Sequence, residues 1–216
     1  MPLLDRPLAA LHDRLTSPSE QRWLGEARRQ LLSGLAGRVP EIGAGTGANF
    51  QHYPSQAQVT AIEPSVHFLK RARAKIATAR ASIELTEADA QALPFANDTF
   101  GAAVATLAFC TIPDSNKALA EVKRVTRAGA PLLMIEHVKA KTLGTQLLQN
   151  LWNPCQNFIA GGCNVNRDTE AVVRDAGFQV EEIRELVTEL FLWPQVMIRA
   201  TNPKAAPLFG TPCSCL

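Results

Sequence analysis

The stretch Glu41-Ile42-Gly43-Ala44-Gly45-Thr46-Gly47-Ala48-Asn49 decides the fold of this 216-residue chain. It follows a β-rich run and opens into a predicted helix. Glycines let the backbone turn sharply and approach a ligand closely, and such turns bind nucleotides at the carboxyl edge of parallel sheets. The motif alone leaves the cofactor open. Gly43, Gly45 and Ala48 also fit the dinucleotide fingerprint, in which Glu63 would be the ribose-binding acid.

Short β-rich runs and helical stretches alternate on the carboxyl side of this motif. The expected strands cover residues 39–42, 58–63, 82–86, 101–107 and 130–138, with a terminal pair at 178–186 and 195–201; the expected helices cover 65–79, 115–126 and 168–176. Such alternation predicts parallel strands with helices on both faces. We therefore expect an α/β fold with a doubly wound, seven-stranded, mostly parallel sheet. Pro40 is unusual in a central strand, because proline cannot donate to the ladder.

Residues 1–37 are expected to form helices outside this sheet. A break at Pro18 separates a second amphipathic helix, residues 20–35, from a first helix with leucines on one face: Leu4, Leu8, Leu11 and Leu15. We interpret the leucine face as packing on the domain, as a lid, or as a contact with a membrane surface. The predicted organisation is thus an N-terminal helical lid or cap, residues 1–37, and a cofactor-binding domain, residues 38–216.

Composition limits the partners of the chain. Its net charge is +2, and no basic stripe is interleaved with aromatic residues, so a nucleic-acid partner is not expected. No run approaches the roughly 20 apolar residues that span a bilayer, and the start does not resemble a secretory signal. These features predict a cytoplasmic protein with a small-molecule partner and at most a peripheral membrane contact.

The five cysteines indicate reduced thiols rather than a disulfide framework. Cys110 lies inside an apolar run, which predicts a buried thiol. The tail residues Cys213 and Cys215 are too few to form a metal site by themselves. Three of the four histidines are scattered along the chain, so we expect no metal centre: His12, His52 and His67.

Three acidic residues favour a cofactor with an amino-acid part. Glu41 lies just before the glycines, where a carboxylate would suit an ammonium group better than a pyrophosphate. Glu63 ends the next strand, where it can accept both hydroxyls of a ribose. Asp89 follows the third strand and can accept from an adenine amino group, while the turn Leu93-Pro94-Phe95 walls the ring.

This set of motifs resembles the class I methyltransferases that use S-adenosylmethionine (SAM), in the branch that includes quinone C-methyltransferases. The motifs that carry it are Glu-Ile-Gly-x-Gly-Thr-Gly and Asp-Ala-x-x-Leu-Pro-Phe, within residues 38–138. The resemblance implies that Gly43, Gly45 and Gly47 line the methionine part of SAM, that Glu63 holds the ribose, and that Asp89 with Ala90 holds the adenine. The remaining expected cofactor contacts are Glu41, Ala44, Asn49, Pro64 and Thr106.

A narrower resemblance, to the methyltransferase-like thiol S-methyltransferases, extends beyond the cofactor motifs. Its residues are Thr46-Gly47-Ala48-Asn49-Phe50, Tyr53-Pro54, Glu136-His137-Val138, Trp152, Gly162-Cys163-Asn164 and Arg167. It implies a thiol acceptor near Glu136, Trp152, Cys163, Asn164 and Arg167. The animal members carry an N-terminal membrane anchor that has no counterpart here, which weakens the transfer of their substrate and membrane location.

The expected reaction needs no nucleophile from the protein, because the methyl group of SAM is already electrophilic. The enzyme must hold the acceptor in line with that methyl group. A thiol reacts as thiolate, and His137, at the end of the fifth strand, is the candidate base; its alternative role is to shape the pocket. Other hypotheses are a lipid amine or quinone methyltransferase, a nicotinamide-dependent oxidoreductase, and a non-catalytic SAM-binding protein.

Overall fold

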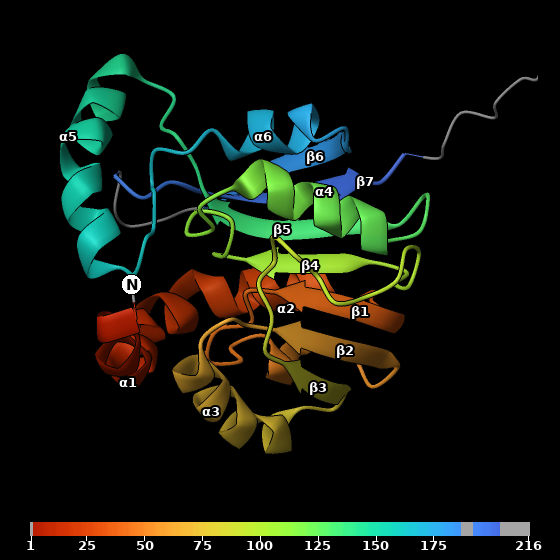
Figure 1. The fold of residues 1–216 in the computed structure, drawn as a ribbon. Coiled ribbons are helices and arrows are strands. Elements are labelled where there is room, and N and C mark those ends of the chain that lie inside the picture. The colour runs from red at the N-terminus through yellow and green to blue at the C-terminus, as the bar shows by residue number, and fades with distance from the viewer. Residues whose placement is uncertain (1, 187–191, 204–216) are drawn as a thin grey trace, which may run out of the picture.

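A seven-stranded sheet forms the centre of the computed structural model, which describes residues 2–186 and 192–203 (Figure 1). The strands lie in the order β3-β2-β1-β4-β5-β7-β6. Only β7 runs antiparallel to its neighbours. Their bounds are β1 Gly37–Ile42, β2 Ala57–Ile62, β3 Ser82–Thr86, β4 Ala103–Thr106, β5 Pro131–His137, β6 Gln179–Leu186 and β7 Gln195–Thr201. The expected doubly wound, mostly parallel sheet is confirmed.

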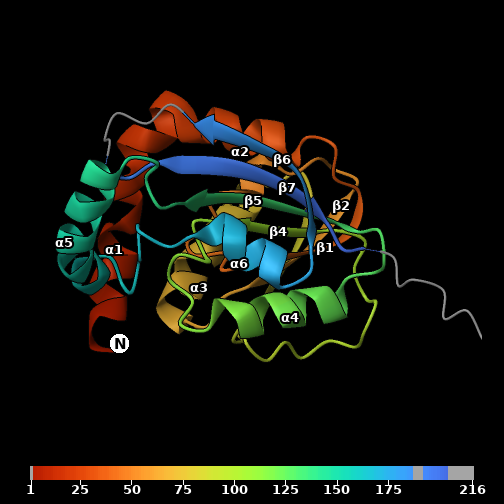
Figure 2. The same ribbon diagram turned by 90° about the horizontal axis from the view of Figure 1, so that it is seen from above.

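Helices cover both faces of the sheet. Helices α2 (Gly25–Leu32) and α3 (Val66–Lys75) contribute to one buried apolar cluster, and α4 (Ser115–Val125) and α6 (Thr169–Asp175) contribute to the other. Figure 2 shows α2 on one side of the sheet and α4 and α6 on the other. Both faces are thus shielded from solvent, which is why the central strand β4 is buried along its whole length.

Strand β1 is the point at which the winding of the sheet reverses. The chain proceeds from β1 through β2 to β3 on one side and then returns to place β4 on the other side of β1. Helices α1 (Pro2–Ser19) and α5 (Leu143–Ile159) lie beyond the carboxyl ends of these strands (Figure 1). A crevice for ligands is expected at this position in doubly wound folds.

The N-terminal helices depart from the expected break at Pro18. Helix α1 continues through Pro18 to Ser19, and a π-helical turn, Glu20–Leu24, then joins it directly to α2. A Cβ on Gly25 would lie 2.6 Å from the carbonyl oxygen of Glu20. The prediction of an interruption at Pro18 was therefore wrong: the helix continues past the proline, and the irregularity follows it, in a wider turn that requires glycine at its end.

The position of Pro40 in β1 explains why a proline is tolerated there. The register between β1 and β4 begins only at Glu41, opposite Val104. On the same side, the N–H of Gly101 donates to the carbonyl oxygen of Arg38. The ladder with β4 thus starts just after Pro40, and no donor is needed from it.

Candidate active site

The glycine-rich loop after β1 adopts a backbone that glycine alone tolerates easily. Gly43, Gly45 and Gly47 have φ angles of 66°, 56° and 78°. A Cβ on Gly43 would lie 2.6 Å from the Cβ of Ala108, in the loop after β4. The two loops therefore approach each other at the carboxyl edge of the sheet. Ala44 is buried between them, and its N–H donates to Ile62 at the end of β2.

Glu63 lies at the end of β2 and faces this loop. Its side chain is largely buried, and its carboxylate accepts from the N–H of Gly45 at 3.1 Å and from the N–H of Ser65 at 3.0 Å. Pro64 is exposed beside it. The Glu63 carboxylate thus lies against the glycine-rich loop at the carboxyl edge of the sheet.

A buried polar network connects the start of the loop to β4 and α2. The amide of Asn49 donates to Glu41 Oε1 and to Thr106 Oγ1, both at 2.9 Å, and the hydroxyl of Tyr53 donates to Glu41 Oε2 at 3.0 Å. Arg28 Nη1 donates to Asn49 Oδ1 at 2.7 Å and to Thr106 Oγ1 at 2.5 Å. Three of the expected cofactor residues, Glu41, Asn49 and Thr106, are therefore brought together.

Glu41 is fully enclosed in this network. Burial raises its pKa to about 7, against the opposing effects of the Tyr53 and Asn49 hydrogen bonds and of the Arg28 charge. Its carboxylate oxygens already hold Asn49 and Tyr53, so in this structure Glu41 positions the loop.

Arg28 is a site residue that the sequence analysis missed. It is 5% exposed, and its guanidinium also pairs with Glu20 from the π-helical turn, at 3.0 Å. The signal was present: Arg28 follows Leu24 by four residues and precedes Leu32 by four, which places a charge on the apolar face of α2. An arginine in that position needs buried acceptors.

The turn at Asp89, which was expected to hold the adenine, follows β3. Asp89 is exposed and accepts from both the N–H and the side-chain amide of Gln91, whereas Ala90 is buried. Arg124 on α4 donates to the carbonyl oxygens of Leu93 and Phe95. The turn is therefore fixed by α4, and the Asp89 carboxylate lies at the surface of the turn.

Glu136, at the end of β5, holds the loop after β4. Its carboxylate is inaccessible and accepts from the N–H groups of Ala108, Phe109 and Cys110 at 2.9–3.2 Å. Burial raises its pKa to about 7, although these backbone hydrogen bonds oppose the shift. Glu136 was expected to line the acceptor pocket, but its oxygens are directed to this loop instead.

Arg167 and Asn164 hold the same loop from its other side. Arg167 Nη1 donates to the carbonyl oxygens of Phe109 and of Ile112, the latter at 2.8 Å. The Asn164 amide donates to the carbonyl oxygen of Cys110 at 3.2 Å. Both residues were expected at the acceptor, and in the structure both bind the backbone of the loop after β4.

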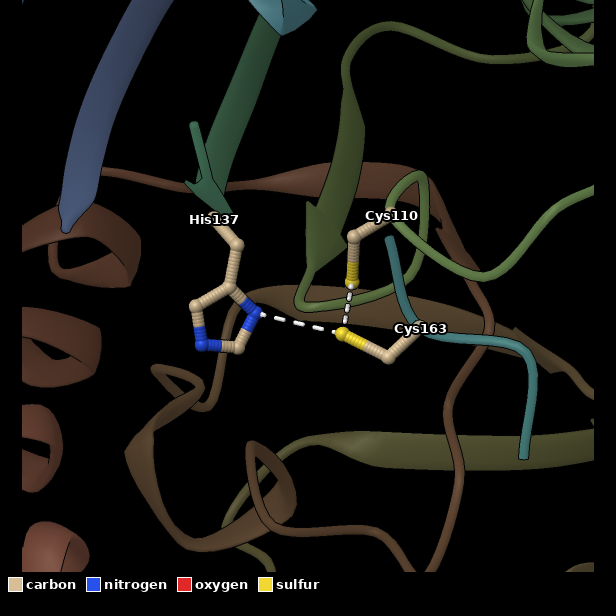
Figure 3. A group of neighbouring side chains, drawn as sticks. All are labelled: Cys110, His137 and Cys163. Atoms are coloured by element: carbon tan, nitrogen blue, oxygen red, sulfur yellow. Dashed lines mark hydrogen bonds between the residues drawn. The ribbon is translucent and has the colours of Figure 1, made fainter. Parts of the chain in front are cut away.

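Three side chains from separate segments meet beyond this loop (Figure 3). Cys163 Sγ lies 3.6 Å from Cys110 Sγ and 3.6 Å from His137 Nδ1. Both cysteines are buried, and His137 is half-buried. Hydrogen bonding from Cys110 and from His137 lowers the pKa of the Cys163 thiol, while that of Cys110 is raised by its bond to Cys163 and by burial.

Trp152, on α5, is another residue expected at the acceptor. It is half-buried on α5, and its indole N–H donates to Gln156 one turn along the same helix. The tail with Cys213 and Cys215 lies outside the described residues. Among the helices of the described part, none is long and apolar enough to cross a membrane.

Comparisons with known proteins agree with this geometry. The family described as "Methyltransferase domain" matches residues 40–134. Human thiol S-methyltransferase TMT1B is 31% identical over 204 residues, which cover 86% of this chain and 82% of the human protein. Human thiol S-methyltransferase TMT1A is 29% identical over 167 residues, covering 74% of this chain and 68% of that protein.

Solved structures show the same fold. A SAM-dependent methyltransferase from Thermotoga maritima superposes with a TM-score of 0.68 at 21% identity, over 94% of this chain and all of that one. These findings decide against a nicotinamide-dependent oxidoreductase and in favour of an enzyme that uses SAM. The chain belongs to the class I SAM-dependent methyltransferases, in the family of thiol S-methyltransferase TMT1B.

Proposed function

We propose that this enzyme methylates the sulfur of small, apolar thiols. The observation that carries the proposal is the kinship with the TMT1 thiol S-methyltransferases along most of both chains. The chemistry of the acceptor end supports it. Cys110, Cys163 and Val165 form a small buried apolar cluster with Ala160 and Trp193 packed on it. Such a surface suits a neutral thiol better than a cationic amine, because an unpaired charge is costly to bury.

The residues of the cofactor half fit SAM. Arg28 is a buried guanidinium beside the loop, and a guanidinium matches the carboxylate of the methionine part. We assign the ribose hydroxyls to Glu63 and the adenine amino group to Asp89, with the turns at Gly43–Gly47 and Ala90 as walls. When bound, SAM supplies a methyl group on a positively charged sulfur. The task of the protein is to align a thiolate with it and to exclude water.

We propose that residues 1–37 cover the site as a lid. Thr46 Oγ1 donates to the Asp13 carboxylate at 2.6 Å, and Lys75 on α3 donates to the same oxygen at 2.8 Å. A Cβ on Gly161, after α5, would lie 3.2 Å from a methyl group of Leu8. Helix α1 therefore contacts both the cofactor loop and the end of α5, which supports its role as a cover over the carboxyl edge.

Apolar side chains on the outside of the two outer helices support a peripheral membrane contact as part of the proposal. Leu15 on α1 is 70% exposed, and Leu147 and Leu151 on α5 are 70% and 80% exposed. Apolar acceptors concentrate in bilayers, so a contact there would bring the enzyme to them. The free thiols of Cys110, Cys155 and Cys163 suit a reducing compartment, and we place the protein in the cytoplasm.

The test is a screen for S-adenosylhomocysteine formation with alkyl thiols, phospholipid amines, phenols and quinones of matched size. We expect turnover with thiols and a methyl thioether as product by mass spectrometry. Turnover confined to amines or quinones would replace the thiol with that acceptor. Release of the enzyme from phospholipid vesicles by Leu147→Lys together with Leu151→Lys, with unchanged turnover of a soluble thiol, would support the membrane contact.

A further inference from the structure

The arrangement of Cys110, His137 and Cys163 has the composition of a soft-metal site. Their ligand atoms lie within 4.8 Å of one another. Each comes from a different segment: the loop after β4, the end of β5, and the turn after α5 (Figure 3). Two thiolates and an imidazole form a donor set that selects Zn²⁺ among the common divalent cations.

Two of the three distances between the ligand atoms match those that zinc imposes. Zinc–sulfur bonds are about 2.3 Å and zinc–nitrogen bonds about 2.0–2.1 Å, so a tetrahedral centre separates two sulfurs by about 3.8 Å and a sulfur from a nitrogen by about 3.6 Å. Here Cys163 Sγ is 3.6 Å from Cys110 Sγ and 3.6 Å from His137 Nδ1. The ligand atoms of Cys110 and His137 lie within 4.8 Å of each other, so these two atoms must approach by about 1 Å or less to share one ion.

Gln195 on β7 supplies a second, independent observation. It is 7% exposed, and its Oε1 is buried without a hydrogen-bond partner among the described residues, while its Nε2 lies 3.3 Å from His137 Nε2. A half-turn of this amide would let Oε1 accept from His137 Nε2–H. His137 would then present an unprotonated Nδ1 to the cysteines, and such an outer hydrogen bond is what orients a metal-bound histidine.

We propose that Cys110, His137 and Cys163 bind one Zn²⁺ ion with three protein ligands and one open position. Zinc sites that act on substrates keep such a position, whereas structural sites fill all four. If the acceptor thiol reaches this cluster, the open position would hold it as a thiolate, and its proton would pass to solvent. This second part rests on the proposed thiol substrate. The ion would then take over the activation that the sequence analysis assigned to His137 as a base.

The first experiment uses metal binding to the intact chain, without SAM and without turnover. The protein, kept reduced by a phosphine, is loaded with Zn²⁺ or with Co²⁺, dialysed and analysed for metal content. We expect one ion per chain and, for Co²⁺, absorption bands of thiolate ligation. Cys110→Ala, Cys163→Ala and His137→Ala should each weaken Zn²⁺ binding by at least 10-fold. Circular dichroism without metal checks that each variant is folded.

Two control variants separate this cluster from other thiols. Cys155→Ala removes an exposed thiol on α5, and Cys213→Ala with Cys215→Ala removes those of the tail. Both should retain one ion. Failure of the intact chain to retain Zn²⁺, or retention that depends on the tail cysteines, would overturn the proposal whatever the acceptor proves to be.

The second experiment tests the open position on the Co²⁺ protein. Addition of 2-mercaptoethanol should change the Co²⁺ spectrum, whereas dimethyl sulfide, which has no proton to lose, should not. An unchanged spectrum with the thiol would overturn the open position. Both readouts are spectroscopic and do not depend on the acceptor screen. A zinc site without thiol turnover would therefore count against the proposed substrate alone, and thiol turnover without zinc would count against the metal site alone.

Discussion

The cofactor half and the acceptor half of the site differ in the polarity of their buried side chains. The cofactor half buries charged and polar groups, Arg28, Glu41, Asn49 and Tyr53, in one connected network. The acceptor half places sulfur and imidazole in an apolar cluster and confines its one buried carboxylate, Glu136, to backbone N–H groups. The difference fits the two ligands: SAM brings the charges of an amino acid, which must be matched, whereas the proposed thiol is apolar except for the sulfur that reacts.

The largest effect is expected where the acceptor half depends on a single carboxylate. Glu136→Ala leaves the N–H groups of Ala108, Phe109 and Cys110 without their acceptor, at about 1–3 kcal/mol for each buried group. Urea unfolding should show a loss of about 3 kcal/mol or more. Glu136→Gln, which keeps one oxygen, should lose clearly less. Equal and small losses in both variants would show that the loop is held by other contacts.

Glu41 gives the cofactor half a pH-dependent stability. Its pKa is raised by burial to about 7 in the folded state, above the ordinary value of 4.5. The contribution of Glu41 to the free energy of unfolding is therefore fully present below pH 4.5 and is lost as the pH rises through 7. Relative to Glu41→Gln, the parent should lose on the order of 1–3 kcal/mol between pH 5 and pH 8.

Chemical denaturation of the parent and of Glu41→Gln across this pH range measures the effect. Groups that titrate in both proteins, Glu136 included, cancel in the difference. Two parallel pH profiles would mean that Arg28 and the hydrogen bonds from Asn49 and Tyr53 keep Glu41 ionised throughout.

Ribose recognition should depend on Glu63 and not on acidity at the surface in general. Glu63→Gln removes a charge whose hydrogen bonds are worth roughly 1.5–3 kcal/mol, so calorimetry should show SAM binding about 10-fold weaker or more. Asp98→Asn is the matched control, because Asp98 is exposed and has a φ of 55° that asparagine tolerates. Equal affinities for the two folded variants would contradict the assignment of Glu63.

The smallest effect is expected at the contact between α1 and the glycine-rich loop after β1. Asp13→Ala removes the acceptor of Thr46 and Lys75, and a part-exposed contact of this kind is worth about 0.5–1 kcal/mol. The KM for SAM should rise roughly two- to fivefold. Glu26→Ala, which removes an exposed pair with Arg29 on the outside of α2, serves as the control. A KM unchanged by Asp13→Ala would argue against α1 as a lid.

More of the cofactor half than of the acceptor half could be predicted from the sequence, because the residues of the acceptor half come from distant segments. The cofactor half is dominated by one local motif, so its glycines, Glu63 and the Asp89 turn could be placed from spacing and resemblance. Arg28 was missed because its partners Asn49 and Thr106 lie 21 and 78 residues away. In the acceptor half, Cys110 and Cys163 are separated by 53 residues, and only the folded sheet brings them together with His137.

The strands were predictable for a related reason. All seven predicted strands are present, with ends that differ by at most a few residues, because alternating β-rich and helical runs are a property of local sequence. The π-helical turn Glu20–Leu24 was not predictable from helix propensity. A π-helical turn is stabilised by what it presents inward, here the pairing of Glu20 with Arg28.

The hydrogen bonds from Glu136 and Arg167 to the loop after β4 also bear on how readily this enzyme can change its substrate during evolution. Glu136 holds three of its N–H groups and Arg167 two of its carbonyl oxygens, so its peptide groups are fixed between a buried carboxyl group and a guanidinium. A loop so held tolerates little remodelling. New acceptor preferences should therefore arise by substitution in the outer helices α1 and α5, where exposed positions such as Leu11 and Leu148 can vary without disturbing this loop.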